Sequence, residues 1–452
     1  QILRDFKPKM AAVNETSLMD YGMKATFGNQ IQKKNTTYGY NLVASYKSET
    51  DFYQDAEFSR YGLADPEIYE MERREYQTGD YGVENVFLTG MAGLAIKKQK
   101  SKYRLNLLHL QNGNSEAGIF DYSGSDQGST FDAFQHNIDY SQRSLTNALL
   151  EGKHSVDKSR WQVTWKLSPT YSKIDDPDVR FVRYEKEDGG SVDIGTEVGF
   201  PERIWRELDE INLSGKVDVE HEFTFLGDDA KLKFGLANTF KERDFTIRSF
   251  ALNIRNMPLT GDPDELFFEE NLWPYNDDKN RGTTYEARFV PTNPNSFNSM
   301  ANVSAGYIST ELALSEKLNS IVGVRVENYR HYYSGINQST NIEFDDEELI
   351  DEIDIFPTLN LIYNVNKKQN IRLSVSKTIA RPSFKEMSFA EIYDPITGRT
   401  FIGGMFNDED PVNEITYWDG NLESSDIYNA DIRWELFMDK GQMISFSGFY
   451  KK

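Results

Sequence analysis

The feature that most constrains this chain is a regular alternation of short polar turns and long connections between segments of period-2 sequence. In residues 160–171, 371–376 and 428–436, large apolar side chains alternate with polar or charged ones. Side chains of a β-strand point to opposite faces in turn, so this alternation predicts strands with one apolar face. No comparably long segment has the 3.6-residue period of an amphipathic helix. The sequence therefore predicts an all-β fold of about fourteen strands.

The two kinds of connection predict two different edges of the sheet. Short turns, several with lysine, are expected at 32–36, 97–101, 226–230, 315–320, 364–369 and 438–441, with a slightly longer one at about 152–159. Long connections are expected at about 50–82, 113–133, 175–210, 250–300, 335–353 and 382–425. Because successive connections between adjacent antiparallel strands lie at opposite edges, every short turn falls at one edge and every long connection at the other.

These proportions are typical of an up-and-down barrel that spans the bacterial outer membrane. Such barrels have short periplasmic turns and long extracellular loops. The expected strands of about 10 to 17 residues exceed the roughly 5–6 of globular proteins and suffice for the roughly 9–11 that a tilted membrane strand needs. Aromatic residues recur near the strand ends, as interfacial girdles require. The alternative, a soluble all-β protein such as a propeller, should show a repeat of about 40–50 residues, and we find none.

The composition argues against several other classes of protein. The formal charge of −22 argues against nucleic-acid binding, which needs clustered lysine and arginine. The absence of cysteine excludes disulfides and thiol chemistry. No run of about 18 apolar residues is present, which excludes a membrane-spanning helix.

The sequence carries no recognisable catalytic motif. We find no phosphate-binding loop, HExxH motif or nucleophile elbow, so the chain is expected to be no enzyme and to hold no cofactor. Its five scattered histidines form no zinc-type cluster. Acidic runs occur at 175–178, 261–271, 343–354 and 407–414. They fit a solvated surface, Ca²⁺ binding by clustered carboxylates, or ion bridges to lipopolysaccharide, so metal binding stays open.

Two groups of side chains are candidates for the mouth and the interior of such a barrel. Aromatic residues on the long connections are expected either to bind substrate or to pack one loop against another. These residues are Phe267, Phe268, Trp273, Tyr275, Tyr393, Tyr417 and Trp418. Polar residues at inward strand positions are expected to line the lumen, namely Gln162, Thr164, Lys166, Arg325, Arg372, Arg433 and Glu435.

Four segments in the second half of the chain resemble one known family. They are GYISTELALSEKLNSIVGVRVEN (306–328), DIFPTLNLIYNVNKKQNIRLSVSKTIARPSFKEMS (354–388), GNLESSDIYNADIRWELF (420–437) and SFSGFYKK (445–452). In this order and spacing they are similar to the barrel of TonB-dependent outer-membrane receptors. The match is close over about residues 300–452, and the first half is similar in architecture, more as in Bacteroidota members of the family.

The resemblance implies a fold larger than this chain. The family's barrel has twenty-two strands around a plug, so about fourteen strands make this chain a barrel fragment without the plug domain. Residues 1–16 are similar to the linker that follows a plug, and residues 17–452 to a partial barrel. Arg381-Pro382 marks the extracellular end of a strand, where a proline without an N–H is tolerated.

The resemblance also implies a function. It is TonB-dependent active uptake of a scarce nutrient across the bacterial outer membrane, with a siderophore, an oligosaccharide, a peptide or cobalamin as the substrate. The implied partners are outer-membrane lipid and lipopolysaccharide, the TonB complex acting through a plug outside this chain, and, in some relatives, a surface lipoprotein lid. Two alternatives stay open: a passive porin or structural barrel subunit of a secretion or surface assembly, and a soluble secreted β-rich binding protein.

Overall fold

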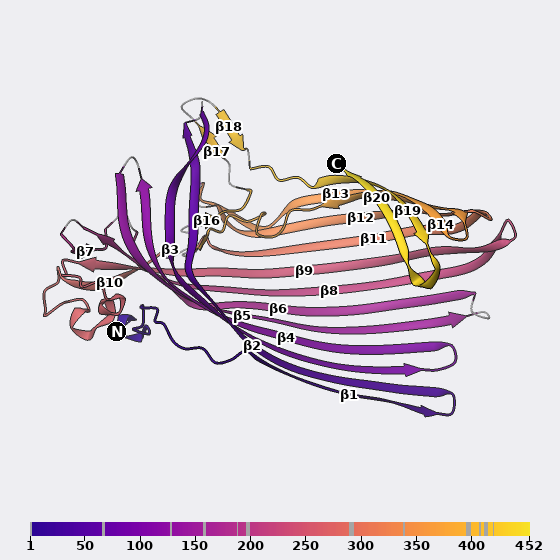
Figure 1. The fold of residues 1–452 in the computed structure, drawn as a ribbon, viewed down its shortest axis with the longest axis horizontal. Coiled ribbons are helices and arrows are strands. Elements are labelled where there is room, and N and C mark those ends of the chain that lie inside the picture. The colour runs from indigo at the N-terminus through magenta and orange to yellow at the C-terminus, as the bar shows by residue number, and fades with distance from the viewer. Residues whose placement is uncertain are drawn as a thin grey trace.

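The computed structural model is built around one large antiparallel sheet that curves into a trough (Figure 1). It describes residues 2–65, 68–126, 129–156, 160–187, 189–195, 199–288, 293–337, 340–394, 399–405, 408–410, 415–418 and 420–452. Fourteen strands follow one another in chain order: β1 (Tyr21–Lys33), β2 (Thr36–Asp65), β3 (Ile68–Lys97), β4 (Ser101–Asp126), β5 (Ser129–Val156), β6 (Trp161–Lys186), β8 (Glu202–Phe225), β9 (Asp228–Arg255), β11 (Ser296–Ser315), β12 (Leu318–Asn337), β13 (Ile342–Asn366), β14 (Gln369–Ala380), β19 (Ser425–Phe437) and β20 (Met443–Lys451). This up-and-down order confirms the predicted barrel fold.

Short elements complete the structure. β7 (Val192–Asp193) pairs with β6, and β10 (Gly282–Ala287) pairs with β9. Two small hairpins are formed by β15 (Ile392–Asp394) with β16 (Arg399–Phe401) and by β17 (Asp408–Asp410) with β18 (Ile415–Trp418). The helices are α1 (Ile2–Asp5), η1 (Pro263–Phe267), η2 (Glu269–Asn271) and η3 (Asp439–Gly441). None of the described helices has the length and apolar character needed to cross a membrane.

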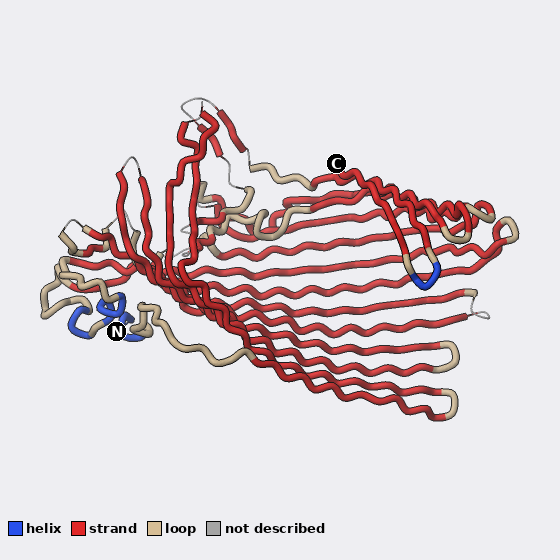
Figure 2. Tube along the Cα trace, in the orientation of Figure 1, coloured by secondary structure: helices blue, strands red, loops and turns tan. Residues whose placement is uncertain are grey.

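The short and the long connections lie at opposite ends of the sheet, as expected. The short-turn end lies at the right in Figure 1 and the long-connection end at the left. Figure 2 shows that most loops and helices gather at the long-connection end, η3 being at the other end. Residues 1–16, expected as a linker, contain α1 and begin at the long-connection end (Figure 1).

The expected strand lengths are too short for most of the sheet. β2 and β3 have 30 residues each, and their ladder continues through pairs such as Tyr61↔Arg73. β4 and β5 likewise pair through Phe120↔Gln135. The ranges 50–82 and 113–133 are therefore largely paired strand. Outside lipid neither face of a hairpin must be apolar, so the backbone ladder continues where the hydrophobic alternation ends.

One face of the sheet carries a continuous apolar band. Tracing cross-strand partners across the sheet places exposed aliphatic side chains on this face, which we call the outer face: Leu42, Leu94, Leu107, Leu150, Leu167, Val217, Leu236, Ile308, Val324, Ile355, Val375 and Ile432. A band of this extent is too large for a surface in water and fits contact with lipid tails. On β12 and β13 it ends at Val326 and Ile353, beyond which the outer positions are polar.

Among the described residues, the two larger clusters of buried apolar side chains lie at the long-connection end, one on each face. The inner cluster includes Phe245, Phe297, Tyr333, Phe384 and Phe389. The outer cluster includes Met10, Tyr184, Leu252, Leu266 and Phe267. The wall between the two ends needs no core of its own, because lipid covers one face and paired polar groups line the other.

Candidate functional site: the inner face and mouth of the barrel

The inner face within the wall is polar and its charges are paired. Glu151 accepts from Arg104 at 2.5 Å and lies 3.6 Å from the Lys166 ammonium. Arg372 and Arg433 both approach Glu435 at 2.9 Å. All seven residues predicted to line the lumen occupy inner-face positions: Gln162, Thr164, Lys166, Arg325, Arg372, Arg433 and Glu435. This arrangement suits a water-filled interior, since exposed ion pairs need no apolar cover.

The segment after the Arg381-Pro382 strand end folds inward over this face. We call its described residues, 381–394 and 399–405, the inner connection. Arg381 fixes its start by donating to Glu327 at 2.8 Å and to Asp354 at 2.7 Å, and its guanidinium lies 4.7 Å from the centre of the Tyr329 ring. A charged side chain held by two carboxylates and an aromatic face is a rigid anchor.

The inner connection packs through apolar side chains. Phe384, Met387 and Phe389 are almost fully buried. The Phe389 ring stacks on Phe344 with a centroid distance of 5.5 Å, and its main-chain N–H donates to the Tyr333 hydroxyl at 3.3 Å. The connection therefore belongs to the core of the long-connection end.

His331 lies under this connection in an unusual position. The side chain is fully buried, 5.2 Å from the Phe384 ring, and neither ring nitrogen has a hydrogen-bond partner among the described residues. Burial lowers its pKa from 6.5 to about 4. A neutral imidazole is the stable form in such a site, because the charged form would lose its hydration.

Tyr393, one of the predicted substrate-binding residues, lies on the inner connection. Its ring approaches Phe181 edge-on at 6.0 Å, and burial raises its pKa to about 12. It lines a cavity of about 310 Å³ with charged and polar residues that include Glu202, Arg288 and Asn295. Tyr393 is thus a half-buried residue beside a small cavity with both polar and apolar lining residues.

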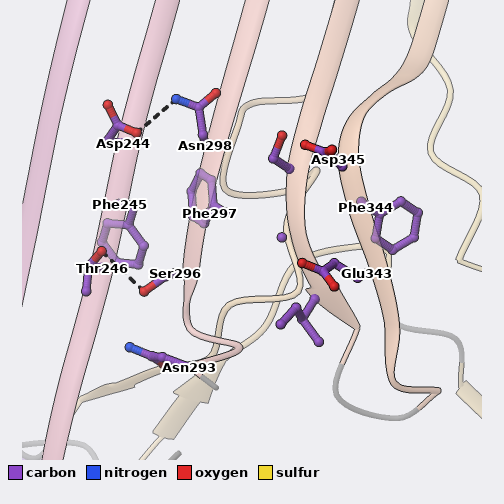
Figure 3. Close-up of a pocket in the computed structure, with 13 residues that line it drawn as sticks. Asp244, Phe245, Thr246, Asn293, Ser296, Phe297, Asn298, Glu343, Phe344 and Asp345 are labelled. Atoms are coloured by element: carbon purple, nitrogen blue, oxygen red, sulfur yellow. Dashed lines mark hydrogen bonds between the residues drawn. The ribbon is translucent and has the colours of Figure 1, made fainter. Parts of the chain in front are cut away.

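A second cavity, of about 340 Å³, opens beside residues 244–246 within β9 and at the ends of β11, β12 and β13 (Figure 3). Three phenyl rings, from Phe245, Phe297 and Phe344, line it together with the carboxylates of Asp244, Glu343 and Asp345. The Asn298 amide donates to Asp244 at 2.9 Å and the Ser296 hydroxyl lies 3.2 Å from that of Thr246. No lysine or arginine is among the described lining residues. The cavity therefore suits a neutral or cationic group with an apolar surface and disfavours an anion.

The other predicted substrate-binding residues lie away from this cavity. Phe267 is buried in the outer cluster. Phe268 and Trp273 are exposed on the β9–β11 connection, where the Trp273 indole donates to the Lys279 carbonyl at 2.8 Å. The Arg281 guanidinium covers the Tyr275 ring at 4.5 Å. Tyr417 and Trp418 belong to β18, and their side chains lie outside the described residues. Of the predicted aromatic residues whose side chains the structure describes, only Tyr393 lies on the inner connection, and Phe267, Phe268, Trp273 and Tyr275 lie on the β9–β11 connection.

Two of the acidic runs have structural roles that the sequence did not indicate. Asp178 forms ion pairs with Arg180 and Arg203. Asp262 caps η1 through the Asp264 N–H at 3.0 Å, and Glu265 accepts from the Thr260 and Gly261 N–H groups. Among the described residues no group of three His, Asp or Glu has the arrangement of a metal site. Of these features only the Asp262-Pro263 helix start carries a sequence signal.

Comparisons with known proteins give a consistent picture of the fold. Residues 94–452 match the protein-family model described as "TonB dependent receptor-like, beta-barrel", and no curated protein matches the chain. Solved structures similar to it include Pseudomonas aeruginosa FpvA bound to a heterologous ferric pyoverdine (13% identity, TM-score 0.54, covering 96% of this chain and 47% of that chain). The ferripyoverdine receptor of the outer membrane of P. aeruginosa bound to ferripyoverdine is also similar (14% identity, TM-score 0.52, covering 97% of this chain and 49% of that chain). The ferric-catecholate import receptor Fiu from Escherichia coli K12 in its closed form is similar too (10% identity, TM-score 0.50, covering 95% of this chain and 57% of that chain). The chain spans about half the length of these structures.

Proposed function

The chain belongs to the TonB-dependent receptor-like β-barrels, a family of outer-membrane transporters and receptors rather than enzymes, and from this premise we propose that it takes part in TonB-dependent uptake of a scarce nutrient. The observation that carries this proposal is the family match over residues 94–452. The two faces of the sheet support it, because an apolar outer band and a charge-paired inner face are what a solute-conducting barrel needs.

The parts of the structure fit successive steps of such uptake. The cavity of Figure 3 and the inner connection lie at the long-connection end, which we assign to the cell surface. Ligand would bind there, and the polar inner face would conduct it once a plug outside this chain is moved by the TonB complex. In this proposal residues 17–452 supply part of the barrel wall and residues 1–16 precede it.

We propose ferric siderophores as the first substrate class to test. Similar structures are those of a receptor bound to ferripyoverdine and of a ferric-catecholate import receptor. The cavity at β9, β11, β12 and β13 adds a constraint, because its three carboxylates disfavour an anionic group at that point. Oligosaccharides, peptides and cobalamin are the further classes, in this order of testing.

The test is uptake by cells that carry the whole protein. Radiolabelled ferric siderophores and the other classes are offered to cells with and without the gene, each in a background with intact or deleted TonB. We expect saturable uptake that needs both the gene and TonB. Uptake that persists without TonB, or ion conductance of the purified barrel without TonB, would overturn the proposal and favour a passive porin.

A further inference from the structure

The segment Leu3–Ala12, which we call the strap, crosses the outer face of the sheet at the long-connection end. Phe6 of the strap stacks on Trp205 at 5.8 Å and meets Phe250 edge-on at 5.5 Å. The pairing of β8 with β9 has no bulge, so Trp205 lies on the same face as Val217 of the apolar band. The strap therefore lies on the outer side of the barrel wall, at the long-connection end and past the end of the apolar band.

Side chains from four elements hold the main chain of the strap. Arg203 of β8 donates to the Lys7 carbonyl at 2.9 Å, and Arg180 of β6 donates to the Lys9 carbonyl at 2.8 Å. Asp264 of η1 accepts from the N–H groups of Met10 at 2.7 Å and Ala11 at 2.8 Å. Nδ1 of His136 on β5 accepts from the Ala12 N–H at 3.1 Å. Five main-chain groups are thus bound by side chains of the barrel.

The groups that bind the strap are themselves positioned by burial and charge. Arg203 is fully buried and ion-paired with Asp178. Burial alone would raise the pKa of Asp264, but the Lys9 ammonium at 2.8 Å and the two N–H groups outweigh it and lower that pKa. Buried charged groups with fixed partners are pre-organised acceptors and donors.

Two pockets accept side chains of the strap. Phe6 enters an aromatic pocket of Trp205, Phe250, Phe267 and Tyr285, with centroid distances of 5.5 to 6.3 Å. Met10 is fully buried in the outer cluster, beside Tyr184 and Leu252. The residues between them, Lys7 to Lys9, are exposed. A site with these two pockets selects an aromatic residue and, four positions later, a flexible apolar one.

We propose that this groove is a peptide-binding site, which the chain's own strap occupies as an exchangeable ligand. Its ligand class is an extended peptide with an aromatic residue and a methionine or similar apolar residue four positions on. Binding of main-chain groups by barrel side chains is the recognition that such a site needs, because it tolerates varied side chains between the two pockets. This inference stands whether or not the barrel transports a siderophore.

The test uses the absence of cysteine from the chain. The protein is expressed whole in the outer membrane with Met10→Cys as the only thiol of this sequence, and its reaction rate with a maleimide is measured. Met19→Cys is the matched control, because Met19 is 89% exposed on the segment that follows the strap. We expect Met10→Cys to react about 100-fold more slowly, because labelling requires the strap to leave its groove.

Free peptide then tests exchange. A synthetic peptide of residues 2–13 in saturating excess should raise the Met10→Cys rate at least about tenfold, because it prevents the strap from rebinding. The same peptide with Phe6→Ala should have little effect. Without peptide, Asp264→Ala should raise the labelling rate of Met10→Cys, whereas Glu269→Ala should not. In a separate measurement, a fluorescent wild-type peptide should bind saturably to the protein that carries Phe6→Ala in its own strap.

Three results would overturn the proposal. The first is a Met10→Cys rate equal to that of Met19→Cys, which would mean that the strap is not bound. The second is a rate that Asp264→Ala raises and free peptide leaves unchanged, together with no saturable binding of the fluorescent peptide, which would make the strap a fixed part of the fold. The third is equal acceleration by the Phe6→Ala peptide, which would show that the pocket selects nothing.

Discussion

The inner connection and the strap lie on opposite faces of the same sheet and are held by different combinations of contacts. The inner connection buries Phe384, Met387 and Phe389. The strap also seats Phe6 and Met10 in pockets, but it keeps Lys7 and Lys9 in solvent and is held in addition by charged side chains that bind its main chain. Burying one large apolar side chain contributes about 1.5–3 kcal/mol, and a hydrogen bond to a charged group about 1.5–3 kcal/mol.

This difference predicts which substitutions and conditions should weaken the docking of each segment. The inner connection concentrates its stability in a few bulky side chains, so the loss of one should have a large effect. The strap spreads its stability over two pockets and several polar contacts, so among the polar contacts only the most buried should matter. Salt should weaken the exposed contacts of the strap and leave the inner connection unchanged.

The largest expected effect is that of Phe389→Ala on the inner connection. Phe389 is 3% exposed and stacks on Phe344, so its truncation should cost about 3–5 kcal/mol of local stability. Limited proteolysis within residues 381–405 measures the free energy of local opening. Phe401→Ala on the same connection is the matched control, since Phe401 is 52% exposed, and it should change that free energy by less than about 0.5 kcal/mol. Equal effects of the two variants would show that the connection is not docked through Phe389.

The next effect is that of Arg203→Met on the strap. The Arg203 side chain is fully buried against Asp178, and removal of one partner of a buried pair should cost about 3 kcal/mol. The readout is the labelling rate of Met10→Cys in the same protein. Arg248→Met is the control, because Arg248 lies on the same outer face in an exposed pair with Glu207 at 2.7 Å, and exposed pairs contribute about 0–1 kcal/mol. If the two variants change the rate equally, buried charge does not hold the strap.

The wall of the barrel could be predicted from the sequence, because lipid imposes a rule on every strand. The alternation of Trp161, Val163 and Trp165 with their polar neighbours fixes which side chains face outward. The same alternation placed Arg372, Arg433 and Glu435 on the inner face, where the structure has them. The positions of the short turns, and the edge of the sheet at which the long connections lie, follow from the same pattern.

The contacts at the long-connection end could not be predicted in this way. Neither face must be apolar there, so alternation carries no information about the face. The decisive contacts also join residues far apart in the sequence, such as Lys9 with Asp264 and Ala12 with His136. Asp264 belongs to an acidic run that the sequence alone does not distinguish from a solvated surface. Only the folded arrangement shows that Asp264 binds main-chain N–H groups. Tyr393 was expected either to bind substrate or to pack one loop against another, and the structure packs it against Phe181 of β6.

A smaller effect on the inner connection is expected from pH. Burial lowers the pKa of His331 to about 4 from 6.5 in the unfolded chain, so the folded connection favours the neutral ring. Its contribution to docking is fully present above about pH 6.5 and is lost progressively as the pH falls toward 4. Limited proteolysis across this range should show the connection opening, and His331→Leu should remove that part of the pH dependence. Identical pH profiles of the two proteins would show that His331 does not titrate within the docked connection.

The smallest effect is expected at the exposed end of the strap, and it sharpens the comparison most. Arg4 and Glu269 lie 2.6 Å apart, but their side chains are 55% and 70% exposed. Solvent and salt screen such a pair. Arg4→Ala should therefore leave the Met10→Cys labelling rate unchanged at physiological salt, whereas Asp264→Ala should raise it. A rate that Arg4→Ala raises as much as Asp264→Ala does would mean that the strap is held by surface charge along its length. The buried contact of Arg203 and the half-buried contacts of Asp264 would then have no special role.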